Sequence, residues 1–170
     1  GMTTAKGIAQ ALKTVGFPAE AIGKGLFAVG MRSSRVVAAA LKHVGVAIKP
    51  LTKVLSRLGY APKNIAVGLK AAGHGVKAIA KNLKSIGLNS ANNIAKALKG
   101  ADFSAKSVAK GLKATGAGAK TIAKALKSAG WSSLKTILRA LKSAGISGYK
   151  TLKGALKAVG ASAKDIIKLL

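Results

Sequence analysis

Residues 106–116 read KSVAKGLKATG, and residues 120–130 read KTIAKALKSAG. Both segments begin with Lys, and a β-branched residue, a Leu and a Gly follow that Lys after two, six and ten residues. The Leu recurs twelve times, from Leu12 to Leu170, at intervals of 14 or 15 residues. Gly follows ten of these leucines by four residues, and Asp102 takes that position after Leu98. Self-similarity this regular predicts a repeat architecture over the whole sequence.

Each unit predicts one short helix and a tight turn. Apolar residues fall at helical spacing, as in Ile122, Leu126 and Ala129, and this spacing indicates one buried stripe on an α-helix. Ala, Leu and Lys favour helices, and the Gly after the Leu is typical of the left-handed residue that ends one. Small polar residues that follow the turns are the expected N-caps: Ser104, Ser132, Ser147 and Ser162.

The fold class follows from the length of these helices. A helix of about ten residues is roughly 15 Å long and is not stable alone in water, so its apolar stripe must pack against neighbouring units. We expect an all-α solenoid of about twelve short helices, stacked as αα-hairpins. A compact helical globule is the alternative, and the even repeat favours the solenoid. Residues 2–170 are expected to form a single α-helical repeat domain, with Gly1 the remnant of a cleaved tag.

The charge composition limits the possible functions. Thirty basic residues stand against three acidic ones, a formal net charge of +27, and Cys is absent. Three carboxylates and two histidines, His43 and His74, leave little material for acid–base catalysis or metal binding. We therefore expect no enzymatic activity, no metal, no cofactor and no small-molecule substrate.

The basic residues follow the helical period on the side away from the apolar stripe. The most regular set forms four triads, each with the spacing i, i+4, i+7, and these residues are the predicted polyanion-binding site: Lys77, Lys81, Lys84, Lys106, Lys110, Lys113, Lys120, Lys124, Lys127, Lys135, Arg139 and Lys142. Glu20, Phe27, Ala39 and Val67 interrupt the pattern nearer the N-terminus, so the main basic surface is expected between Lys77 and Lys157. Because acids are nearly absent, the positive charges repel one another, and an anionic partner would relieve that repulsion.

Nucleic acid is the expected partner. A basic surface of this density is the electrostatic signature of binding to the phosphate backbone of DNA or RNA. Lys outnumbers Arg by 26 to 4, which argues against the bidentate reading of bases that Arg performs. An anionic membrane surface, approached as cationic membrane-active peptides do, is one alternative, and an acidic protein is another. No segment resembles a secretion signal or a spanning helix, so a cytoplasmic location is expected.

Overall fold

The computed structural model describes all 170 residues, and its only regular elements are helices. In chain order they are α1 (Met2–Thr14), α2 (Ala19–Ala28), α3 (Ser34–His43), α4 (Ile48–Arg57), α5 (Pro62–Ala71), α6 (Val76–Ser85), α7 (Ala91–Gly100), α8 (Ala105–Ala114), α9 (Ala119–Ser128), α10 (Leu134–Ser143), α11 (Tyr149–Lys157) and α12 (Ala163–Leu169). The predicted all-α solenoid of twelve short helices is therefore confirmed.

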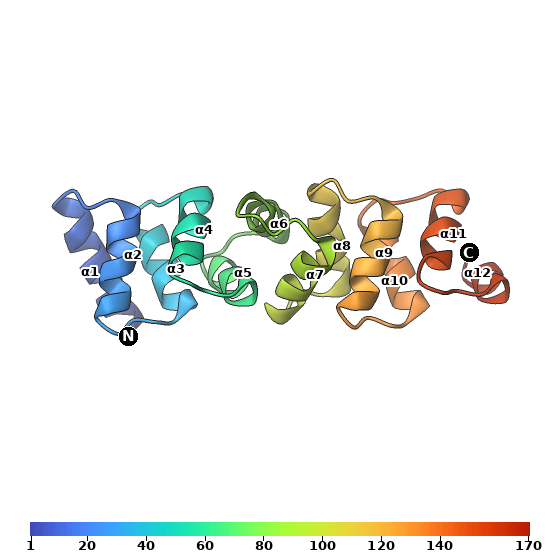
Figure 1. Cartoon of the computed structure of the whole chain (residues 1–170), viewed down its shortest axis with the longest axis horizontal. Helices are drawn as coiled ribbons and strands as arrows, with labels where there is room; N and C mark the ends of the chain where they lie inside the picture. Colours follow the sequence, from blue (N-terminus) through green and yellow to red (C-terminus); the bar gives the residue numbers. More distant parts are fainter.

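The helices form two layers along an elongated molecule whose chain ends lie at opposite ends (Figure 1). In the odd layer, α1, α3, α5, α7, α9 and α11 pack each against the next. In the even layer, α2, α4, α6, α8 and α10 do the same, and α12 continues the layer beside α10, with which it shares a hollow. The helices also change direction along the molecule, since Figure 1 shows α6 almost end-on and α2 and α9 from the side.

The apolar stripe forms the core between the layers. The repeat leucines of α2 through α11 are all completely buried, and one hydrophobic cluster of 43 residues includes members from every helix. Burying one Leu side chain stabilises the folded state by about 1.5–3 kcal/mol. Each helix is too short to be stable alone, so this shared core holds the layers together.

The turns form as the Gly positions predict. At Gly130, with φ +95°, the N–H donates to the Lys127 carbonyl at 2.9 Å, and the next N–H donates to the Leu126 carbonyl at 3.1 Å. This pair of hydrogen bonds is the Schellman motif. Asp102, which replaces the Gly after Leu98, also takes a left-handed backbone, with φ +57°.

The predicted N-caps are correct in two of four cases. Ser104 and Ser162 cap α8 and α12, and each side chain accepts a hydrogen bond from the chain. The predictions Ser132 and Ser147 are wrong by one residue, because α10 is capped by the next residue, Ser133, and α11 starts after Gly148. Both units are 15 residues long, and the extra residue lies in the turn before the cap.

Candidate nucleic-acid interface

All twelve residues of the predicted polyanion-binding site are exposed. The structure divides them between the two layers, because three triads lie on α6, α8 and α10 and the fourth lies on α9. The even layer thus holds nine of the predicted residues next to one another. Lys120, Lys124 and Lys127 lie on the odd layer.

The even layer carries a longer basic surface than the sequence predicted. The sixth and second residues before each repeat leucine form an outer pair on every helix. In α4, α6, α8, α10 and α12 every outer pair is fully basic and exposed, and these ten residues are called the basic stripe: Lys49, Lys53, Lys77, Lys81, Lys106, Lys110, Lys135, Arg139, Lys164 and Lys168. None of the ten makes an ion pair or hydrogen bond within the chain.

The odd layer has no comparable stripe. Its outer pairs are interrupted by five uncharged residues: Gln10, Ala39, Val67, Asn92 and Gly154. The interruptions at Ala39 and Val67, which placed the expected basic surface beyond residue 77, therefore belong to the other layer. On the even layer the basic stripe begins earlier, at Lys49, and continues to Lys168.

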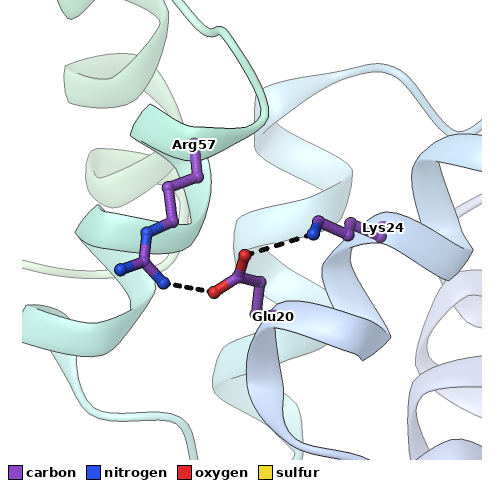
Figure 2. Close-up of polar contacts among 3 residues, drawn as sticks. All are labelled: Glu20, Lys24 and Arg57. Carbon is purple, nitrogen blue, oxygen red and sulfur yellow. Dashed lines mark hydrogen bonds and ion pairs between the residues drawn. The ribbon is translucent and has the colours of Figure 1, made fainter.

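The even layer is neutralised at its first helix. Glu20 takes an outer-pair position on α2, where it accepts a hydrogen bond from Arg57 of α4 and lies 3.3 Å from the ammonium of Lys24 (Figure 2). The Arg57 guanidinium, and after it the Lys24 ammonium, lower the pKa of the Glu20 carboxyl below its ordinary value. The carboxylate therefore stays ionised and offsets charge at this end, so the basic stripe begins at α4.

The third member of most triads has a second role that the sequence analysis missed. The residue directly after the repeat leucine is a Lys in most helices, and six of these lysines donate to backbone carbonyls at the end of the helix two units later. We call them the bridging lysines: Lys42, Lys70, Lys84, Lys99, Lys113 and Lys127. The bond from Lys99 to the Ala129 carbonyl is 2.7 Å long, and that from Lys84 to the Thr115 carbonyl is 2.8 Å long.

A cation at this point interacts favourably with the partial negative charge of the helix C-terminus. Two bridging lysines also lie over aromatic rings, Lys70 over Phe103 at 4.7 Å and Lys99 over Trp131 at 4.9 Å. The bridging lysines thus tie six helices, α3 and α5 through α9, to their successors in the same layer. The available signal was a Lys after the Leu paired with an aromatic residue after a later left-handed turn residue, Asp102 or Gly130, but the Lys and the aromatic residue lie about 30 residues apart.

A hollow of about 570 Å³ lies where α6, α8 and α10 meet. Lys77, Lys81 and Lys110 of the basic stripe line it, together with the bridging Lys113 and the end of α10 around Ala144. No carboxylate faces this hollow. Four ammonium groups around an open depression attract an anion of phosphate size, because each can donate hydrogen bonds to its oxygens.

One acid lies among the residues of the basic stripe, between Lys164 and Lys168 on α12, and one His lies near a bridging lysine. Asp165 forms a capping box with Ser162 at the start of α12, and hydrogen bonds from Ser162 lower its pKa. His74 lies in the turn after α5, where burial and, to a smaller extent, the Lys42 ammonium lower its pKa. Its Nε2 atom is buried without a hydrogen-bond partner. No three His, Asp or Glu side chains lie close enough together to share a metal ion.

None of the helices combines the length and the apolar character needed to cross a lipid bilayer. No protein-family model matches the chain, and comparisons with curated proteins and with solved structures found no match either.

Proposed function

We propose that the protein binds the phosphate backbone of nucleic acids, independently of base sequence, through the basic stripe of the even layer. The observation that carries this proposal is the continuity of the basic stripe: ten exposed cations on five successive helices of one layer, none of them in an ion pair or side-chain hydrogen bond, with Asp165 on α12 the one acid among them. A surface built for solubility mixes both signs of charge. Phosphates that bind to a row of positive charges release the counterions of the nucleic acid, and this release makes binding favourable.

The spacing of the cations suits an extended polyanion. The two residues of each outer pair are separated by about 6 Å along the helix axis, and neighbouring helices of a layer lie about 8–10 Å apart. The helix direction changes along the molecule (Figure 1), so the basic stripe winds around the long axis. A flexible or helical chain of phosphates can follow such a surface, whereas a small anion would use one pair.

The residue types favour backbone contacts over the reading of bases. Nine of the ten stripe residues are Lys, and Arg139 is the single Arg. Lys acts on phosphate as a point charge, whereas the planar fork of Arg is the group suited to bidentate base recognition. Phe103 and Trp131 lie beneath bridging lysines, and this position argues against stacking on unpaired bases.

The buried core supports a rigid nucleic-acid scaffold over a membrane-active role. To insert in a lipid surface, the helices would have to expose the Ile and Leu residues that the core contains, such as Ile79 and Leu83, both completely buried. An amphipathic membrane helix instead keeps its apolar face available. Binding to an anionic membrane is therefore the outcome that the experiment must separate from nucleic-acid binding.

The test compares four ligands over a salt series: two duplex DNAs of unrelated sequence, one RNA duplex, and vesicles with about a third anionic lipid. Circular dichroism is recorded on the same samples. If about eight stripe cations contact phosphates, log K for duplex DNA falls with log salt at a slope near −7, equally for both sequences, and helicity stays constant. Tight binding to vesicles with weak binding to DNA, or a helix signal that appears only with vesicles, would overturn the proposal.

A further inference from the structure

One contact recurs between neighbouring helices of a layer, in the pairs α2 and α4, α3 and α5, and α6 and α8, and we take it as the contact rule. The residue before the repeat leucine of one helix lies against the residue three before the leucine of the helix two units earlier. On α6 and α8 this contact joins Ala80 to Gly111, where an added Cβ would lie 3.3 Å from the Ala80 Cβ. On α2 and α4 it joins Gly23 to Val54. Every internal helix therefore has a front side that meets its predecessor and a back side that meets its successor.

The first helix pair leaves its front side uncovered. Val15 is 71% exposed, whereas Val44, its equivalent one step along the odd layer, is 9% exposed. Val29, at the same position after α2, is 61% exposed. Ala11 and Gly25, which precede the leucines of these helices, are small and uncharged. The front face consists of Ala11, Val15, Gly25 and Val29.

The last helix pair leaves its back side uncovered. Ile167, three residues before the last leucine, is 75% exposed, whereas its equivalent Ala123 on α9 is completely buried. Tyr149 at the start of α11 is 57% exposed. Beside it the ammonium of Lys153 lies 5.5 Å from the ring centre. On the back face, formed by Tyr149, Lys153 and Ile167, the contact rule sets Ile167 against Gly25 of the front face and sets Lys153, whose ammonium lies over the Tyr149 ring, against Ala11.

The bridging lysines supply a second, polar complementarity. Lys157 follows the repeat leucine of α11, so its acceptor would be the end of a helix two units later, and it makes no hydrogen bond within the chain. At the opposite end, no lysine donates to the last carbonyls of α1. If the pattern of the bridging lysines continues between molecules, the Lys157 ammonium donates to the Val15 carbonyl of the next copy, as the Lys127 ammonium donates to the Val159 carbonyl at 2.7 Å.

We infer that a second copy of this chain docks head to tail, with its front face on the back face of the first. Both the apolar contact and the lysine bridge would continue the packing already present between helices of each layer. Such an interface is heterologous and does not close on itself, so the copies add into a row. The net charge of +27 opposes the association, and salt should strengthen it by screening that repulsion. The inference does not depend on nucleic-acid binding.

Sedimentation of the chain over a concentration series, in buffers of low salt and of about 0.5 M NaCl, tests the inference. Above roughly 0.1 M salt the Debye length falls below about 10 Å, so the average mass should rise above 17.0 kDa with concentration, and further with salt. Ala11→Lys on the front face and Ile167→Lys on the back face should each abolish association, because docking would set the first new ammonium against that of Lys153 and would bury the second without a partner. Asn92→Lys, which adds the same charge at an exposed site on the odd layer, is the matched control and should associate as the parent does.

Mixing the two blocked variants separates this interface from a symmetric one. Ala11→Lys retains an intact back face and Ile167→Lys an intact front face, so an equal mixture should form dimers and nothing larger. Both substitutions lie at exposed positions, and circular dichroism checks that each variant is folded. A chain that remains at 17.0 kDa under all conditions would overturn the inference, as would association that survives Ile167→Lys alone or a mixture that stays monomeric.

Discussion

Removing part of the basic stripe should weaken DNA binding far more than removing the same charge elsewhere. The perturbation is the quadruple variant Lys77→Gln, Lys81→Gln, Lys106→Gln and Lys110→Gln, which empties the outer pairs of α6 and α8. Each phosphate contact contributes about 0.9 to the salt slope on duplex DNA. Going from about eight contacts to four should therefore change the slope from near −7 to near −4. At about 0.1 M salt, one decade below a 1 M reference, this corresponds to roughly a thousandfold loss of affinity.

The assay is fluorescence anisotropy with a labelled duplex at five or more salt concentrations. The matched control replaces four odd-layer cations by Gln: Lys6, Arg35, Lys96 and Lys150. It removes equal charge, but from the layer whose outer pairs are interrupted, and should alter the slope by less than about 1. Melting curves should show that neither variant is destabilised, because the lost residues repel their neighbours. Equal losses of affinity and slope in both variants would refute the reasoning, since net charge alone would then explain binding.

Three further outcomes test the structure itself. Lys99→Met should lower the free energy of unfolding, measured in urea, by about 1–2 kcal/mol, because it removes a hydrogen bond to a helix end and a cation–π contact. The control Lys96→Met removes no such contact and should lower it by less than about 0.5 kcal/mol. Gly130→Ala should lower the free energy of unfolding by about 1–2 kcal/mol, because the φ of Gly130 is +95° and an added Cβ would lie 2.8 Å from the Lys99 ammonium. Its control is Gly118→Ala, where φ is −78° and no atom lies within contact distance, and this variant should change stability little. Because burial lowers the pKa of His74 in the folded state, the unfolded state binds more protons, and stability should fall as pH drops below about 6.5. In a His43→Gln background, the further substitution His74→Leu should therefore reduce the fall in melting temperature between about pH 7.5 and 5.5.

Several details show how far local sequence signals reach. Gly130 ends α9 in the left-handed conformation that its position after Leu126 predicts, because this preference depends on the backbone of one residue. Asp102 takes the same conformation in place of Gly, so the repeat position decided its backbone. The cap of α11 differs from the expected Ser147 because the extra residue of its turn makes Gly148 the N-cap, and the cap of α10 differs by one residue because Ser132 and Ser133 carry the same side chain. Their local sequence could not show which of them adopts the cap geometry.

The basic surface shows where local signals end. The lysine triads were recognisable because residues three and four apart share one face of a helix. The continuity of the basic stripe from Lys49 to Lys168 was not recognisable, since its members alternate along the chain with odd-layer residues such as Val67 and Asn92. The role of Lys99 depends on the Ala129 carbonyl, 30 residues away. A contact of that kind has no local signature.

The amino-acid sequence by itself determined that the chain is a series of short helices, where each one ends and which face it buries, because turn chemistry and side-chain periodicity act within a few residues. The tertiary structure decided which cations lie next to one another and which are tied to helix ends. Stacking places every second helix in the same layer, so neighbours on the surface come from units about 30 residues apart. The free energy that sets this arrangement comes from the core shared by all twelve helices, and no single repeat contains it.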